Sequence, residues 1–222
     1  MALIDFMSPL HRATRRDYLA RVNDPEFPKA RAARLAKQWG REYWDGDRRT
    51  GYGGMNYDGR WLPVAEAMAR HYGLRGGDKV LDVGCGKGFL MHDLSRVVPG
   101  LEVHGIDVSD YARMNAKPEV RDRIQGADAT RLPFEDDTFA LVLSINTLHN
   151  LECMDMVRAL REIQRVSARN SYVCVESWRG EEEKANLLYW QLTCESFFSP
   201  RAWEWWFRQA GYEGDYSFIY FE

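Results

Sequence analysis

Apolar and polar positions along the middle of the chain follow two alternating patterns. Short apolar runs, each long enough for one strand, occupy residues 79–83, 101–106, 139–145 and 172–176. The third run is nearly all apolar, as a strand that is covered on both faces must be. Between the runs, residues 89–98 and 152–166 carry apolar positions at helical spacing. Strands that alternate with helices in this way predict an α/β fold, in which a mostly parallel sheet has helices on both faces.

The two ends of the chain differ from its middle. Residues 29–39 have a helical pattern, whereas residues 40–60 hold six glycines interleaved with aromatic side chains. Such a segment is too irregular for a helix and too aromatic for a simple linker. We interpret residues 1–60 as a helical arm that carries a glycine-rich, aromatic lid or cap, and residues 61–222 as the main domain. Few residues follow Gly211, where the last predicted helix ends, so the sheet is predicted to have six or seven strands.

The composition excludes several classes of protein. The chain has 222 residues, a formal net charge of -3 and 45% hydrophobic residues, which are typical of an ordinary globular protein. No apolar run approaches the roughly 20 residues that a membrane helix needs. The start of the chain carries an acid and a proline among its apolar residues, unlike a signal peptide. We therefore expect a cytoplasmic protein without a membrane partner. The four cysteines form no cluster with each other or with histidines, so no metal site is predicted.

The most informative segment is Val80–Gly88, which reads VLDVGCGKG. It places Asp82 near the end of a strand, follows it with glycines at three alternate positions, and leads into a helix. In an open α/β sheet, ligands bind beyond the carboxyl ends of the strands, and glycines let the backbone approach a ligand there. Asp107 ends the next strand, where a carboxylate can accept hydrogen bonds from both hydroxyls of a ribose.

Two classes of cofactor compete for this loop. A dinucleotide site requires the spacing G-x-G-x-x-G, because its pyrophosphate sits on the helix N-terminus. The spacing here is G-x-G-x-G, with Phe89 in the place of the third dinucleotide glycine, and Asp82 is placed to meet a positively charged ammonium. Over about residues 60–210, the chain resembles the class I S-adenosylmethionine-dependent methyltransferases, in the small-molecule branch related to the ubiquinone and menaquinone methyltransferases.

The resemblance rests on several separate segments. Besides the glycine loop, Gly126–Ala129 with the following LPF, residues 137–151 and Phe198–Pro200 match the family. The resemblance implies a Rossmann-like three-layer sandwich, S-adenosylmethionine as cofactor, S-adenosylhomocysteine as product, and no metal. The residues implied to bind the cofactor are Asp82, Gly84, Cys85, Gly86 and Gly88 around its methionine part, Asp107 at the ribose, Val108, Asp128 and Ala129 at the adenine, and Asn146 beside the methyl-transfer site.

Candidates for catalysis follow from their place at strand ends, and candidates for substrate binding come from the aromatic segments outside the cofactor motifs. His149 comes after the fourth strand, at the reactive end of the cofactor, where it either acts as a general base or only forms the pocket wall. Glu176 ends the fifth strand and is the second catalytic candidate; its alternative role is to cap the following turn. Helical spacing favours packing roles for Trp39 and for the cluster at 203–207. The residues predicted to bind substrate are Tyr43, Trp44, Tyr52, Tyr57, Trp61, Trp178 and Tyr189. Core packing is the alternative role for these rings.

We therefore expect an enzyme that transfers a methyl group to a hydroxyl, an amine or a carboxylate of a small-molecule acceptor by direct in-line displacement. An RNA methyltransferase that uses the mildly basic arm is an alternative, although the body of the chain is acidic and nucleic acid is not the favoured partner. A nicotinamide-dependent oxidoreductase is disfavoured by the glycine spacing. A protein that binds the cofactor without catalysis stays open, as does the oligomeric state, a homodimer included.

Overall fold

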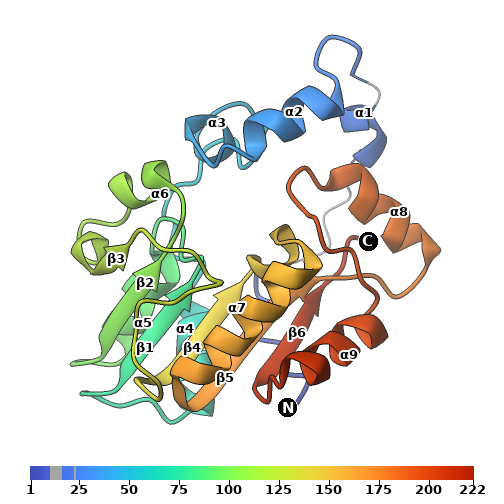
Figure 1. The fold of residues 1–222 in the computed structure, drawn as a ribbon. Coiled ribbons are helices and arrows are strands. Elements are labelled where there is room, and N and C mark those ends of the chain that lie inside the picture. Colours follow the sequence, from blue (N-terminus) through green and yellow to red (C-terminus); the bar gives the residue numbers. More distant parts are fainter. Residues whose placement is uncertain (11–16, 23) are drawn as a thin grey trace.

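A computed structural model describes residues 1–10, 17–22 and 24–222, so residues 11–16 and 23 of the predicted arm lie outside the described residues. The sheet has six strands in the order β3-β2-β1-β4-β5-β6, and every neighbouring pair is parallel. The strands are β1 (Lys79–Val83), β2 (Glu102–Ile106), β3 (Ile124–Gln125), β4 (Phe139–Ile145), β5 (Ser167–Glu176) and β6 (Asp215–Ile219). This topology confirms the predicted Rossmann-like α/β fold, with six strands (Figure 1).

Helices cover both faces of the sheet (Figure 1). The helices are α1 (Tyr18–Val22), α2 (Lys29–Ala36), α3 (Arg41–Trp44), α4 (Leu62–His71), α5 (Phe89–Val97), α6 (Asp110–Met114), α7 (Cys153–Val166), α8 (Glu181–Trp190) and α9 (Pro200–Ala210), with short 3-10 turns at Arg121–Arg123 and Leu148–Asn150. Helices α4 and α5 pack on one face, where Val80 and Leu94 share a buried apolar cluster. Helices α7 and α9 pack on the other face, where Leu81 joins Trp203 and Phe207. Both of these rings are fully buried, which confirms their predicted packing role.

The first residues of the chain lie along β6, the outer strand of the sheet. Helix α9 begins after Ser199, whose hydroxyl accepts a hydrogen bond from the helix backbone, and it ends at Gly211, as predicted, with a φ of 72°. Along the free side of β6, the backbone N–H of Ile4 donates to the carbonyl of Tyr216 (2.9 Å), and the N–H of Tyr216 donates to the carbonyl of Ala2 (3.0 Å). Within the described ranges, the first residues thus cover this edge and no seventh strand is present.

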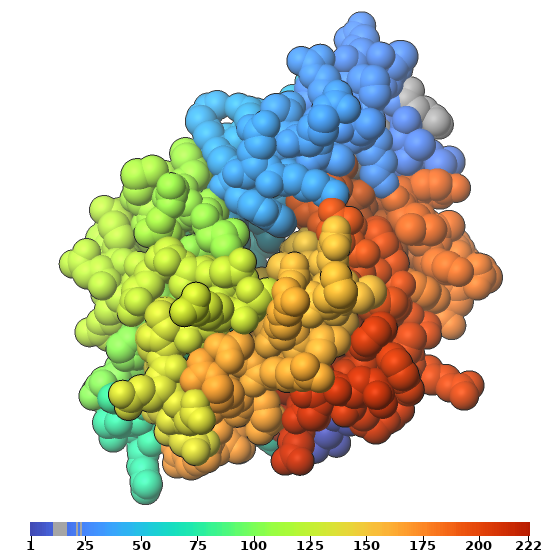
Figure 2. All heavy atoms as spheres, viewed as in Figure 1, coloured from blue at the N-terminus to red at the C-terminus, as the bar shows by residue number. Residues whose placement is uncertain are grey.

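Residues 39–61, which we call the cap segment, lie across the carboxyl ends of the strands (Figure 1). The segment includes α3, a helical turn that the glycine content did not predict. After α3 the chain folds back, so that the backbone N–H of Tyr52 donates to the carbonyl of Tyr43 (2.9 Å). Gly51 permits this fold, because a Cβ there would lie 2.0 Å from the same carbonyl oxygen. Figure 2 shows this part of the chain, in blue, spanning the green and orange parts of the surface.

None of the helices in the described part of the chain has both the length and the apolar character needed to cross a bilayer.

Candidate functional site

The loop after β1 brings backbone rather than side chains to the carboxyl edge of the sheet. Gly84, Gly86 and Gly88 have positive φ angles of 81°, 54° and 71°, a conformation that other residues rarely adopt. A Cβ at Gly84 would lie 2.1 Å from the hydroxyl oxygen of Thr147, and one at Gly86 would lie 2.8 Å from the ring of Trp44. The glycine motif therefore forms a tight turn with no space for larger residues.

Two buried carboxylates flank this loop. Asp82 precedes it within β1. Asp107 follows β2, where its two carboxylate oxygens accept hydrogen bonds from the backbone N–H groups of Gly86 (2.8 Å) and Ser109 (2.7 Å). Burial, with a smaller contribution from the charge of Asp107, raises the pKa of Asp82 to about 7. Burial also raises the pKa of Asp107, although its two hydrogen bonds oppose the shift. The ionised form of each carboxyl would therefore gain from a cationic or hydrogen-bond-donating ligand.

A cavity, which we call the inner cavity, lies between the glycine loop and the cap segment. Its charged lining residues are Asp82, Asp107 and Asp128, all of them acidic. The predicted cofactor-binding residues that line it are Asp82, Gly84, Cys85, Gly86, Asp107, Val108, Asp128, Ala129 and Asn146. Gly88 does not line it, and a Cβ at that position would instead meet the side chain of Val120 at 2.9 Å. The structure thus brings nearly the whole predicted set around one space.

A second cavity, which we call the outer cavity, adjoins the first. The residues that line both cavities are Tyr43, Tyr52, Met55, Trp61, Phe89 and Asn146. Both catalytic candidates, His149 and Glu176, line the outer cavity and neither lines the inner one. The inner cavity is therefore lined by most of the residues predicted to bind the cofactor, and the outer cavity by the two catalytic candidates. The residues common to both cavities lie at the boundary between them.

His149 and Glu176 form a buried pair. Their Nε2 and Oε2 atoms lie 3.6 Å apart, and the two residues are 2% and 6% exposed. Burial raises the pKa of Glu176 to about 8, although a hydrogen bond from Gln191 opposes the shift. Burial lowers the pKa of His149 to about 3 and so keeps its imidazole neutral, and its Nδ1 has no hydrogen-bond partner among the described residues. The pair thus combines a carboxyl that titrates near neutral pH with an unpartnered imidazole nitrogen.

The aromatic residues predicted to bind substrate separate into two groups. Those that line the inner cavity are Tyr43, Trp44, Tyr52 and Trp61. Tyr57, Trp178 and Tyr189 line neither cavity. The Tyr57 hydroxyl donates to Asp93 on α5 (2.5 Å), and the other two side chains pack against the apolar core.

The structure corrects the prediction for Trp39, which the sequence analysis expected to have a packing role. It lines the inner cavity instead. Helix α2 ends three residues before it, and Trp39 itself has a φ of 51°. The helical spacing that favoured packing therefore does not extend to this residue.

Sequence reasoning also missed side chains that complete the site. Lys87, inside the glycine motif, lies with its Nζ 2.7 Å from both carboxylate oxygens of Asp45. Gln191, just after α8, donates to Glu176. No spacing in the sequence relates Lys87 to Asp45, or Gln191 to Glu176. In the ranges that the structure describes, no group of three His, Cys, Asp or Glu side chains could hold a metal ion.

Comparison with known proteins agrees with this geometry. Residues 81–175 match the family described as "Methyltransferase domain". This part of the chain is therefore similar to methyltransferase domains. The matched segment runs from β1 to β5 and contains the glycine loop, Asp107 and the turn that carries His149. It therefore includes most of the sheet side of the inner cavity, whereas the cap segment lies outside it.

Two curated proteins, both methyltransferases by name, are similar to parts of this chain. Malonyl-[acyl-carrier protein] O-methyltransferase of Halorhodospira halophila is 39% identical over 94 residues, which cover 40% of this chain and 31% of that protein. Demethylmenaquinone methyltransferase of a Roseiflexus species is 29% identical over 141 residues, which cover 61% and 57%. The chain thus spans less than two thirds of the length of either relative. The solved structure of the YcgJ protein of Bacillus subtilis shares the fold, with a TM-score of 0.53, 22% identity and 66% of each chain covered.

Proposed function

We propose that this chain transfers a methyl group from S-adenosylmethionine to a hydroxyl, an amine or a carboxylate of a small-molecule acceptor, by direct in-line displacement. One observation carries the proposal: an inner cavity with only acidic charged side chains shares a wall with an outer cavity that holds a buried acid–base pair. A cationic donor and an acceptor would then meet at that wall. Holding two reactants in line is the main contribution that a protein makes to such a displacement.

The inner cavity suits this donor better than a dinucleotide. S-adenosylmethionine carries an ammonium and a sulfonium, and it supplies the methyl group with a neutral thioether as the leaving group. Asp82 would hold the ammonium, which favours the ionised form that burial penalises. Asp107 already accepts two backbone hydrogen bonds, but a carboxylate offers about four acceptor sites, so two ribose hydroxyls still fit. Asp128 and Ala129 would meet the adenine. A pyrophosphate in the same cavity would face acidic side chains.

The outer cavity favours an acceptor that loses a proton. The acceptor oxygen or nitrogen forms a bond to the methyl carbon while the carbon–sulfur bond breaks and its electron pair stays on sulfur. The proton of the acceptor then needs a base within hydrogen-bond reach. Of the two candidates, Glu176 has the pKa nearer to neutral pH, whereas that of His149 is far below it. We therefore assign the proton to Glu176, with His149 beside it, and place hydroxyl and amine acceptors ahead of carboxylates.

Ligand binding tests the donor half of the proposal. S-adenosylmethionine or S-adenosylhomocysteine at 100 times its Kd should stabilise the folded chain by about 2.7 kcal/mol in a thermal unfolding assay, whereas NAD should not. Asp107→Asn should lose most of this stabilisation. Asp110→Asn is the matched control, because its side chain is 77% exposed, and it should behave as the wild type. Stabilisation by NAD alone would overturn the proposal.

Transfer of a labelled methyl group tests the acceptor half. With methyl-labelled S-adenosylmethionine, the chain should label a mixture of small metabolites and leave total RNA unlabelled. Glu176→Gln should reduce the labelling at pH 7 while its Kd for S-adenosylhomocysteine stays unchanged, because Glu176 lines only the outer cavity. Label in RNA would instead favour the alternative in which the basic N-terminal arm binds nucleic acid.

A further inference from the structure

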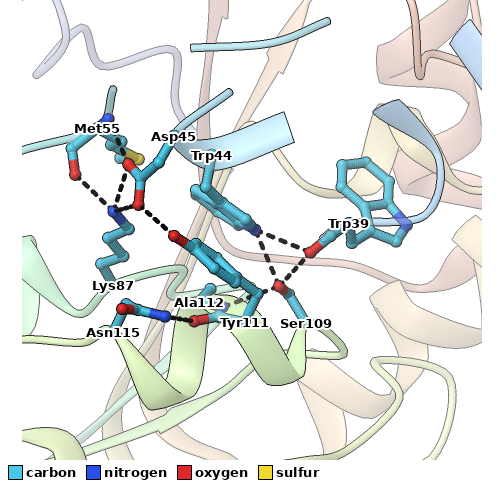
Figure 3. Close-up of polar contacts among 9 residues, drawn as sticks. All are labelled: Trp39, Trp44, Asp45, Met55, Lys87, Ser109, Tyr111, Ala112 and Asn115. Atoms are coloured by element: carbon cyan, nitrogen blue, oxygen red, sulfur yellow. Dashed lines mark hydrogen bonds and ion pairs between the residues drawn. The ribbon is translucent and has the colours of Figure 1, made fainter. Parts of the chain in front are cut away.

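A charged contact that the sequence did not predict joins the cap segment to the glycine loop (Figure 3). Lys87 extends from the loop toward the cap, where its Nζ lies 2.7 Å from both carboxylate oxygens of Asp45 and 2.9 Å from the carbonyl oxygen of Met55. The hydroxyl of Tyr111, on α6, donates to the same carboxylate (2.9 Å), as does the backbone N–H of Met55 (3.0 Å). One side chain of the cap, Asp45, thus connects three parts of the chain.

The preceding residue, Trp44, makes the second contact between the same parts. Its ring lies so close to Gly86 that a Cβ there would come within 2.8 Å of it. Its indole N–H donates to the Ser109 hydroxyl (2.9 Å), and Ser109 in turn donates its backbone N–H to Asp107 (2.7 Å). Trp44 therefore contacts both of the strand-end loops that bound the inner cavity.

Burial makes the contact between Lys87 and Asp45 difficult to break. Lys87 is only 5% exposed, and a buried ammonium without a partner carries a large desolvation penalty. If Asp45 moved away, Lys87 would have to leave its position as well. Lys87 lies between Gly86 and Gly88, whose positive φ angles shape the loop. The position of the cap and the shape of the glycine loop are therefore linked.

We propose that Asp45 is a positioning residue for the methyl donor. Through Lys87 and Tyr111 it holds Trp44 over the glycine loop, so that the cap closes the inner cavity, and donor binding and cap closure stabilise each other. Asp45 itself lines neither cavity, so it acts only through these neighbours. The inference rests on the proposed function, because it takes the inner cavity as the donor site.

Asp45→Asn in the full chain tests this coupling, with Asp47→Asn as the matched control. Asp47 lies two residues farther along the cap, and its carboxylate pairs with Arg49 at the surface (2.8 Å). In calorimetric titrations, the Kd for S-adenosylhomocysteine should rise at least about tenfold in Asp45→Asn and stay within about twofold in Asp47→Asn. Hydrogen exchange of the backbone amides of residues 43–55 should slow when the ligand binds to the wild type, and stay fast in Asp45→Asn.

A double variant separates positioning from a general loss of structure. Asp45→Asn combined with Lys87→Met should bind S-adenosylhomocysteine more tightly than Asp45→Asn alone, because replacing both partners costs less than leaving one charge buried and unpaired. Tyr111→Phe removes one hydrogen bond from the same carboxylate and should raise the Kd about two- to fivefold, which keeps the test valid if Asp45→Asn does not fold.

The outcomes distinguish this inference from the proposed function. An unchanged Kd and unchanged amide exchange in Asp45→Asn, or a double variant that binds no better than the single one, would overturn the inference alone. A wild-type chain that binds neither S-adenosylhomocysteine nor S-adenosylmethionine would overturn the proposed function together with it.

Discussion

The inner cavity has two walls that are built differently. On the sheet side, backbone groups fix the geometry: the N–H groups of Gly84 and Cys85 donate to the carbonyl of Ile106 (2.9 and 3.0 Å), and the glycine loop follows directly from the end of β1. On the cap side, side chains fix it, above all Asp45 with Lys87. A backbone contact survives most substitutions, whereas a side-chain contact is lost with one residue. We therefore expect changes on the sheet side to abolish most donor affinity, and changes on the cap side to reduce it less, by leaving the donor less enclosed.

A matched pair of glycine substitutions would test this difference most strongly. A Cβ at Gly84 would lie 2.1 Å from the hydroxyl oxygen of Thr147, and one at Gly51 would lie 2.0 Å from the carbonyl oxygen of Tyr43, so both clashes are severe. Gly84→Ala should weaken binding of S-adenosylhomocysteine by more than about 100-fold, because its φ of 81° is disfavoured as well. Gly51→Ala should displace only the cap and weaken binding about tenfold.

Calorimetric titration of the two glycine variants measures this contrast, with circular dichroism to confirm that both are folded. If both variants lost the same affinity, the sheet side and the cap side would contribute equally to donor binding, contrary to this prediction.

Glu176 should give the next largest effect, on stability rather than on donor binding. Burial raises the pKa of its carboxyl to about 8, so the folded state binds this proton more tightly than the unfolded state does. The free energy of unfolding should therefore fall as the pH rises from about 4.5 to about 8. Glu176→Gln removes the charge and should raise the free energy of unfolding at pH 7 by on the order of 2–3 kcal/mol, with little change at low pH.

Urea unfolding of the wild type and of Glu176→Gln at pH 5 and pH 7 checks this prediction. If Glu176→Gln were less stable than the wild type at both pH values, the prediction would be wrong. The ionised carboxylate would then have a partner that offsets the free-energy cost of its burial.

Asp82 should make donor affinity depend on pH, with a smaller effect. Its pKa is raised to about 7 in the free chain, and an ammonium beside it favours the ionised form. The affinity for S-adenosylmethionine should therefore increase about five- to tenfold between pH 6 and pH 7.5. Asp82→Asn should bind more weakly and without this pH dependence, whereas Asp128→Asn should retain it. A slope that persists in Asp82→Asn would assign the titration to another group.

The sequence predicts the sheet side of the inner cavity better than the cap side. The sheet side is predictable because Asp82 and Asp107 stand at fixed positions relative to strand ends, and strands such as Phe139–Ile145 follow from their apolar runs. The cap side is not, because the contact between Asp45 and Lys87 joins residues that no local pattern relates. The matched family segment begins at residue 81, after the cap segment.

Aromatic composition shows the same limit in more detail. The surplus of rings in the cap predicted a ring-lined cavity, and Tyr43 and Trp44 do line it. Composition does not distinguish a ring that lines a cavity from one that anchors the segment. Tyr57 anchors the segment because its hydroxyl donates to Asp93, a buried acid on α5. The apolar pattern of that helix does not predict this contact.

Tyr57 anchors the far end of the cap and should give the smallest effect on donor binding. Its hydroxyl donates to Asp93, which is fully buried and whose other carboxylate oxygen has no hydrogen-bond partner in the described part of the chain. Tyr57→Phe should lower the free energy of unfolding by about 1–2 kcal/mol, because the buried carboxyl loses a donor. Tyr189→Phe, the control, should cost less than about 0.5 kcal/mol. Donor affinity should change less than in Asp45→Asn, since Asp45 still holds the near end; a larger change would make Tyr57, rather than Asp45, the residue that positions the cap.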